Sequence, residues 1–312
     1  MEALTNLNVT REQAKAQGPR GRSQGLRGRR FATIGLMGLF LALALLAGAD
    51  NAVVLRPVAS MYSGASEDTD VVSQAICGAN VTLLESRPGW RRVRTADEYT
   101  GWMPAAALKA GLPYGTSGRV AEVASLFAHI YREPDVTRHQ PLLTAPFEGR
   151  LEVVAEPAGN ERWLQVRLPD DRSGWVQRGD VEFSPKTLSI EETVALARRF
   201  LGLPYTWGGT SSFGYDCSGF TQMLCHRRGI LMPRDAGPQA QWSGVAPVAR
   251  EDLRPGDLLF FGGSVEKITH TGMYIGGGQF IHATTYLHPV VQISDLGDAH
   301  WTALLVAMRR PR

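Results

Sequence analysis

The feature that most constrains the fold is a tryptophan-centred pattern that occurs twice, 73 residues apart. The first copy reads W-R-R-V-R from Trp90 and closes with G-W at Trp102. The second reads W-L-Q-V-R from Trp163 and closes with G-W at Trp175. A pattern repeated at a fixed offset predicts that the same structural unit is formed twice.

Each copy follows an alternating apolar run, at residues 81–84 and 151–154, with turn-forming residues between the segments. Short alternating segments separated by turns are typical of strands in a small barrel. We therefore expect two small all-β barrels, at residues 50–110 and 118–184. The tryptophans are expected mainly in the barrel cores, because large aromatic side chains dominate the cores of small domains.

The periodicity changes after Pro185. Ser189 followed by Glu192 is the pattern of a helix N-cap with a capping box, and apolar residues then recur at helical spacing until Gly202. Strand-like segments follow farther along the chain. Residues 186–312 are therefore expected to form a third domain, of the α+β class.

Residues 1–49 have the pattern of an export signal. Residues 1–30 carry seven Arg or Lys against two Glu, and residues 31–49 are uncharged, apolar and end in Ala47-Gly48-Ala49. A basic region, an apolar region and a small-residue site predict export, with cleavage near Ala49, or a membrane anchor formed by residues 31–49. In both cases the remainder of the chain is exported, to be secreted, associated with the cell wall or held on the outer side of the membrane.

Charge and cysteine content exclude two functional classes. The formal charge of the chain is +3 and that of residues 1–30 is +5, so the remainder is close to −2 and has no basic excess for nucleic-acid binding. The three cysteines, Cys77, Cys217 and Cys225, show no metal-binding spacing. We expect no metal or other cofactor, and a monomer.

Cys217 is the candidate nucleophile. Apolar residues at helical spacing follow it, and a cationic stretch with Gly229 ends the pattern. Cys217 would thus lie in the first turn of a helix, where the dipole and the free N–H groups favour a thiolate. The alternative is a buried and inert structural cysteine.

Two histidines could complete a catalytic set. His270 lies in an alternating segment, and His282 follows a triple-glycine turn. If the hairpin pairs Ile275 with Gln279, His282 lies opposite Gly272 and diagonal to His270, within side-chain reach. A slip of one residue would put the histidines on opposite faces. In the favourable register His270 is the base and His282 orients its ring.

Four motifs around these residues closely resemble the NlpC-type family of papain-like cell-wall cysteine peptidases. They are P-Y-T-W-G-G (204–209), D-C-S-G-F (216–220), R-P-G-D-L-L-F-F (254–261) and T-H-T-G-M-Y-I-G (269–276). The resemblance implies an α+β catalytic domain with Cys217 as nucleophile, His270 as base and His282 as third residue. The duplicated tryptophan pattern resembles bacterial SH3-like domains.

The whole layout resembles one subgroup, the γ-D-glutamyl-L-diamino-acid endopeptidases similar to dipeptidyl-peptidase VI. In that subgroup the first SH3-like domain closes one end of the groove, and the substrate must have a free N-terminal L-Ala. The resemblance implies cleavage between D-Glu and the diamino acid of peptidoglycan-derived peptides such as L-Ala-γ-D-Glu-diaminopimelate. It leaves open whether the diamino acid is diaminopimelate or Lys.

The family match also implies substrate-binding residues. Asp216 and Ser218, with Tyr99 and Glu67 of the first SH3-like domain, match the residues that bind the free amine. An ammonium in a closed site needs carboxylate and hydroxyl acceptors, or its desolvation would oppose binding. Alternatively, Asp216 is a helix N-cap and Glu67 a solvated loop charge.

The loop M-P-R-D-A at residues 232–236 is placed by the resemblance near the D-Glu portion. Arg234 could pair with its α-carboxylate, or with Asp235 or another acidic side chain of the protein. Tyr205 is expected to approach the reacting carbonyl and to donate to the oxyanion, and Trp207 to shape the pocket.

Three other functions remain open. The chain could be an amidase or endopeptidase of the same fold that acts on intact peptidoglycan, a wall-binding protein without enzymatic activity, or an acyltransferase acting on lipids. The complete Cys/His/His set argues against the second, and the paired SH3-like domains argue against the third.

Overall fold

The computed structural model describes residues 50–116, 118–159 and 161–312, all within one compact unit. The predicted export signal or anchor at residues 1–49 lies outside the described residues. In the part of the chain that is described, no helix is both long and apolar enough to cross a membrane.

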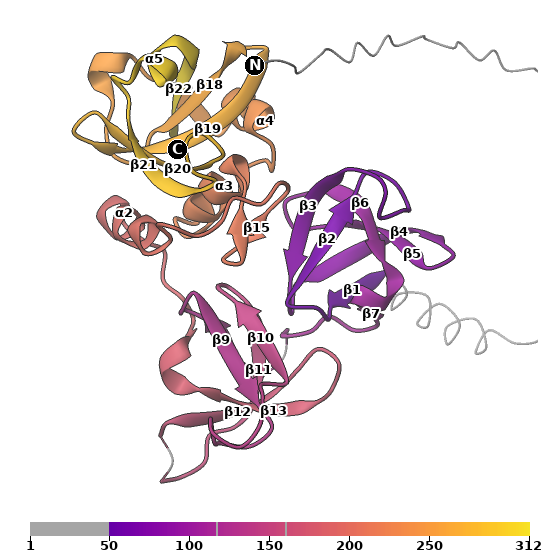
Figure 1. Cartoon of the computed structure of the whole chain (residues 1–312). Coiled ribbons are helices and arrows are strands. Elements are labelled where there is room, and N and C mark those ends of the chain that lie inside the picture. The colour runs from indigo at the N-terminus through magenta and orange to yellow at the C-terminus, as the bar shows by residue number, and fades with distance from the viewer. Residues whose placement is uncertain (1–49, 117, 160) are drawn as a thin grey trace, which may run out of the picture. The chain divides into compact units, whose positions relative to one another are not determined.

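The first tryptophan repeat lies in a seven-stranded antiparallel sheet with the order β3-β2-β6-β5-β4-β1-β7 (Figure 1). A short 3-10 helix, η1 (Ala105–Ala107), precedes its last strand. The strands are β1 (Asn51–Val54), β2 (Val58–Tyr62), β3 (Val71–Ile76), β4 (Asn80–Arg87), β5 (Trp90–Arg94), β6 (Thr100–Pro104) and β7 (Leu108–Ala110).

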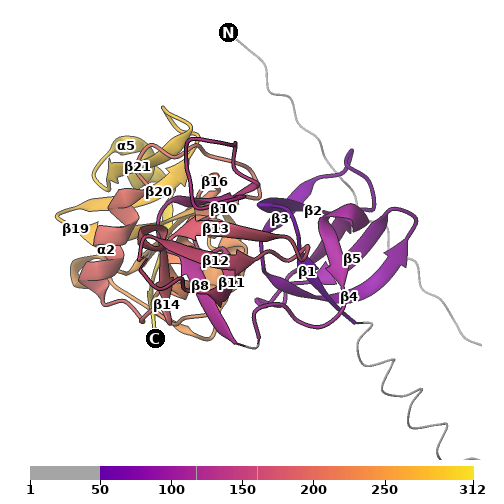
Figure 2. The ribbon, with the colours of Figure 1, turned by 90° about the horizontal axis from the view of Figure 1, so that it is seen from below.

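The second repeat lies in a sheet with the equivalent order, β10-β9-β13-β12-β11-β8-β14. A second 3-10 helix, η2 (Arg178–Asp180), again precedes the last strand, so even this detail is repeated. The strands are β8 (Arg119–Val123), β9 (Phe127–Tyr131), β10 (Leu143–Pro146), β11 (Arg150–Ala155), β12 (Trp163–Arg167), β13 (Ser173–Gln177) and β14 (Val181–Phe183), several of which are visible in Figure 2.

Equivalent aromatic pairs explain why the tryptophan pattern is duplicated. Tyr62 meets Trp90 edge to face with ring centroids 5.5 Å apart, and Tyr131 meets Trp163 in the same way at 5.7 Å. The second tryptophan of each pattern lies beside the same tyrosine in the sheet. The expectation of two SH3-like β-domains is confirmed, and each has its own buried apolar core.

The C-terminal part is α+β, as expected. Its main sheet has six strands in the order β17-β22-β18-β19-β20-β21, and β15 (Thr210–Ser211) pairs separately with β16 (Gly214–Tyr215). The helices are α2 (Ile190–Arg199), α3 (Cys217–His226), α4 (Ala236–Gln241), η3 (Arg250–Asp252) and α5 (Ala299–Leu304). The sheet strands are β17 (Val245–Pro247), β18 (Leu258–Ser264), β19 (Lys267–Gly276), β20 (Gln279–Thr284), β21 (Val290–Asp295) and β22 (Leu305–Pro311).

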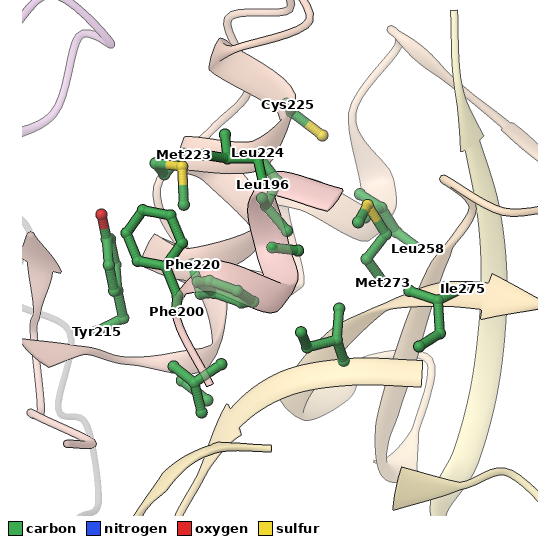
Figure 3. Close-up of a cluster of buried hydrophobic side chains, with 14 of the residues drawn as sticks. Leu196, Phe200, Tyr215, Phe220, Met223, Leu224, Cys225, Leu258, Met273 and Ile275 are labelled. Atoms are coloured by element: carbon green, nitrogen blue, oxygen red, sulfur yellow. The ribbon is translucent and has the colours of Figure 1, made fainter. Parts of the chain in front are cut away.

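Both faces of the central strands are buried, because helices cover them on either side. Figure 3 shows Phe220 and Leu224 of α3 with Leu258 and Met273 of β18 and β19, within a larger buried cluster. On the opposite face, a second cluster forms around Trp301 of α5. This double burial explains why L-L-F-F in β18 is apolar at every position rather than alternating.

Candidate active site

Cys217 is the first residue of α3, so the predicted position at a helix start is confirmed. The side chain of Asp216 caps the helix and accepts the backbone N–H of Gly219 at 2.7 Å. Gly219 has no room for a side chain, because a Cβ there would lie 2.1 Å from the carbonyl oxygen of Gly209. The glycine of D-C-S-G-F thus lets the preceding loop pack directly on the first turn.

The hairpin of β19 and β20 brings the two histidines together. Nε2 of His270 lies 2.7 Å from Nδ1 of His282. The expectation that His282 lies opposite Gly272 is also confirmed, because a Cβ on Gly272 would be 2.9 Å from Cβ of His282. The pairing expected at the turn was wrong. Gln279 pairs with Gly276 instead of Ile275, and an irregularity in the ladder absorbs the extra residue before the histidines.

The backbone N–H groups of Thr271 on β19 and of Ser218 on α3 lie near the sulfur of Cys217 and lower the pKa of the thiol. They favour the thiolate, as expected for a helix start. Burial opposes them and outweighs them, because Cys217 is 8% exposed, and it raises the pKa of the thiol to about 12. In the substrate-free protein the sulfur is therefore a thiol, and attack requires a base.

His270 is held in an aromatic environment. Its ring stacks on the indole of Trp301 with centroids 5.1 Å apart and an interplanar angle of 28°. Burial, with a smaller contribution from His300, lowers the pKa of His270 to about 3. His270 is therefore a neutral imidazole in the free protein, able to accept a proton.

His282 is fully buried and makes a second hydrogen bond. Its Nε2 lies 2.9 Å from Oγ of Ser294 on β21, while its Nδ1 faces His270. Neither Ser294 nor Trp301 was identified from the sequence. The segment 290–295 has a strand-like composition, but which of its side chains meets His282 depends on a pairing between distant segments.

Arg234 lies beside the nucleophile and is 2% exposed. Its guanidinium binds both oxygens of Asp216, at 3.0 and 2.6 Å, and Oγ of Ser218 at 2.9 Å. It also donates to Oγ of Ser73, which belongs to the first SH3-like domain. Of the two partners foreseen for Arg234, the structure therefore shows an acidic side chain of the protein, and that side chain is Asp216.

Tyr99 also reaches this loop from the first SH3-like domain. Its hydroxyl lies near the Asp235 carboxylate, and burial followed by the charge of Asp235 raises the pKa of Tyr99 to about 12. Asp216 is near enough to contribute to the same shift. Glu67 is exposed on the loop before β3 and makes no hydrogen bond or ion pair with the described residues. Binding of the substrate amine by Tyr99, Asp216 and Glu67 stays a prediction.

The two aromatic residues of P-Y-T-W-G-G have different environments. Tyr205 is half-buried, and the proximity of Cys217 and Asp216 adds to the effect of burial in raising the pKa of its hydroxyl. Trp207 is 71% exposed. The next residue, Gly208, has φ +72° and lies so close to Val71 of β3 that a Cβ would be 2.7 Å from Cγ1 of Val71. Both aromatic roles stay predictions.

Gln239 is a further residue that the sequence analysis missed. It is fully buried, and its Nε2 donates to the carbonyls of Ser218 and Pro233, at 3.0 and 2.9 Å. Its Oε1 accepts the hydroxyl of Thr221. This single amide ties the loop that carries Arg234 to the nucleophile helix.

The arrangement supplies the parts of an acyl-transfer site: a thiol at a helix start, a neutral imidazole as base and a second imidazole that orients it. The residues that surround these parts come from the catalytic domain and from the first SH3-like domain.

Comparisons with known proteins agree with this geometry. Residues 202–310 match the model of the NlpC/P60 family, and residues 61–108 match that of the bacterial dipeptidyl-peptidase Sh3 domain. A γ-D-glutamyl-L-lysine dipeptidyl-peptidase of Bacillus cereus is 34% identical over 68% of this chain and 66% of its own, just under two thirds of that relative. An enzyme of the same name from Bacillus subtilis is 29% identical over 79% of this chain and 83% of its own.

A solved structure extends the similarity to three dimensions. The crystal structure of an NlpC/P60 family protein from Bacillus cereus superposes with a TM-score of 0.73 and 26% identity, covering 84% of this chain and 99% of that one. The similarity therefore includes the SH3-like domains as well as the catalytic domain.

Proposed function

This chain belongs to the NlpC/P60 family, and on that premise we propose that it is a cysteine endopeptidase acting on peptidoglycan-derived peptides. The bond cleaved joins γ-D-Glu to the diamino acid of stem peptides that carry a free N-terminal L-Ala. The observation that carries this proposal is the thiol of Cys217 at the start of α3, packed against the strand of the hydrogen-bonded pair His270 and His282.

The chemistry is acyl transfer. The Cys217 sulfur attacks the γ-carbonyl carbon of D-Glu as His270 takes the thiol proton. The carbonyl oxygen becomes negative and accepts hydrogen bonds from the Cys217 backbone N–H, one of the unpaired donors of the helix start, and from Tyr205. His270 then protonates the leaving amine, and water hydrolyses the thioester to release the acid.

The free amine is the proposed determinant of where the peptide is cut. Oδ2 of Asp216 accepts a bond from Arg234, and a carboxylate oxygen has a second lone pair for an ammonium. Tyr99 and Asp235 add acidic and hydroxyl groups beside it. Ser218 and Glu67 are further proposed acceptors for the ammonium. An ammonium bound by these groups would place the second peptide bond of the substrate at the Cys217 sulfur. Trp207 would cover the bound peptide.

The relatives are named for lysine at the third position, which supports L-Ala-γ-D-Glu-L-Lys as a substrate beside the diaminopimelate peptide. The test is mass spectrometry of both tripeptides after incubation with the wild type, Cys217→Ala and Cys225→Ala. Cys225 is a matched control, since it is buried in the same helix about two turns beyond Cys217. We expect release of L-Ala-γ-D-Glu by the wild type and Cys225→Ala alone. Unchanged turnover by Cys217→Ala would refute the assignment of Cys217 as the nucleophile.

Blocking the amine separates this proposal from its rivals. An N-acetylated tripeptide should lose nearly all cleavage, because a neutral amide cannot pair with Asp216. Cleavage of the acetylated peptide or of intact sacculi at a similar rate would indicate an amidase or endopeptidase of the same fold that acts on the wall itself.

We further propose that the protein is exported as a monomer. The basic and apolar pattern of residues 1–49 supports export. N-terminal sequencing of the protein recovered outside the producing cell should find Asp50 or a nearby residue at the start, whereas an intact N-terminus in the membrane fraction would indicate an anchor. Light scattering during gel filtration measures the molar mass and so tests whether the protein is a monomer.

A further inference from the structure

Ser294 is linked to the catalytic pair through His282. It lies on β21, the edge strand of the six-stranded sheet, where it pairs with Phe280 of β20. His282 is two residues farther along β20, and the diagonal relation brings Oγ of Ser294 to 2.9 Å from Nε2 of His282. The three side chains thus form a line from His270 through His282 to Ser294.

The line has two possible proton arrangements. In the first, His270 carries its proton on Nε2 and donates it to Nδ1 of His282, which must then carry its own proton on Nε2. In the second, His282 donates from Nδ1, and His270 carries its proton on Nδ1. Only the first leaves Nδ1 of His270 with a lone pair for the Cys217 proton.

The first arrangement needs an acceptor for Nε2–H of His282. His282 is fully buried, and a buried N–H without a partner is costly. Oγ of Ser294 is at hydrogen-bonding distance and half-buried, so its own hydroxyl hydrogen is free to donate to solvent while its lone pair accepts from the ring. We propose that Ser294 is a positioning residue that accepts the Nε2–H of His282 and so holds the histidine pair in the tautomer required for His270 to act as base.

The proposal rests on the proposed roles of Cys217 and His270, and its proton balance is closed within the site. The Cys217 S–H bond breaks as the S–C bond forms, and the proton moves to Nδ1 of His270. When the tetrahedral intermediate collapses, the same proton goes to the leaving amine. No proton crosses His282 or Ser294. Their hydrogen bonds strengthen while His270 is positively charged and relax when it is neutral.

The test compares Ser294→Ala, Ser294→Thr and Ser294→Asp with the control Ser264→Ala, a serine of the same sheet whose hydroxyl bonds only the exposed Glu266. Two readouts are taken against pH: kcat and KM on L-Ala-γ-D-Glu-L-Lys, and the rate at which iodoacetamide alkylates Cys217. Alkylation reports the thiol–imidazole pair without any peptide, so it remains informative if the proposed substrate is wrong.

For Ser294→Ala we expect kcat to fall by about 2- to 10-fold, the loss that corresponds to one hydrogen bond between neutral groups, since His282 itself stays neutral, with KM little changed. The acidic limb of kcat/KM should move to lower pH, because the imidazolium of His270 loses stabilisation. Ser294→Asp should move that limb to higher pH, because a carboxylate favours the protonated pair. Ser294→Thr keeps the hydroxyl and should recover most of kcat.

The rate of Cys217 alkylation should likewise fall in Ser294→Ala and be largely recovered in Ser294→Thr. The proposal is overturned if Ser294→Ala matches Ser264→Ala in kcat and in its acidic limb, or if Ser294→Thr is as slow as Ser294→Ala, which would indicate packing alone. If the wild type leaves the tripeptide intact but substitutions of Ser294 still change the alkylation rate of Cys217, the proposed substrate is refuted and the role of Ser294 is supported.

Discussion

Replacing Arg234 by Met tests how the nucleophile helix is held. The guanidinium is 2% exposed and binds both oxygens of Asp216, which caps α3 beside Cys217. Removing one partner of a buried pair costs about 3–5 kcal/mol, because the remaining charge stays buried and uncompensated. Asp216 keeps the N–H of Gly219 and the hydroxyl of Ser218 as donors, so we expect the lower end of that range, about 3 kcal/mol.

The assay is urea unfolding followed by circular dichroism, with kcat and KM measured on the same samples. Arg172→Met is the matched control, because Arg172 pairs with Asp170 at the surface and such pairs contribute at most about 1 kcal/mol. Arg234→Lys should fall between wild type and Arg234→Met, since it keeps the charge but not the planar fork.

The outcome also separates two roles of Arg234. An arginine that contacts the D-Glu carboxylate directly, one of the two alternatives that the sequence left open, would raise KM when replaced and leave stability intact. An unfolding free energy of Arg234→Met within about 1 kcal/mol of wild type would refute the reasoning from the ion pair.

Three further predictions follow from packing and charge. Trp301→Leu should lower kcat more than Trp301→Phe, because only an aromatic face stabilises the stacked imidazolium of His270, and steady-state kinetics checks this. Glu148 raises the pKa of His226, so this contact stabilises the fold fully below the pKa of a free histidine, about 6.5, and is lost as pH rises through the raised value; melting temperature should fall as pH rises above about 6.5, and less so in His226→Gln. Gly208→Ala should destabilise the protein in thermal melts, because a left-handed φ and contact with Val71 both oppose a Cβ.

The positions of the repeated strands, the nucleophile and the histidine pair could be predicted because they depend on local patterns. The two tryptophan copies predicted two equivalent sheets, since alternation within a strand requires only neighbouring residues. Cys217 at a helix start followed from the cap and the apolar spacing after it. The relation of His270 to His282 followed from a hairpin, in which sequence distance and register are directly linked, and the irregularity at the turn left that relation intact.

The environment of the chemistry was decided only by the tertiary structure. The indole beside His270, the hydroxyl beyond His282 and the carboxylate that holds Arg234 come from segments that local periodicity does not connect. The depth of burial, which keeps the Cys217 thiol protonated against its helix start, likewise depends on how domains and sheet faces pack. The sequence by itself thus determined which residues form the nucleophile and base, because their placement rests on short-range pattern. Long-range contacts, which exist only in the folded chain, decided which residues orient the nucleophile and the base and shift their pKa values.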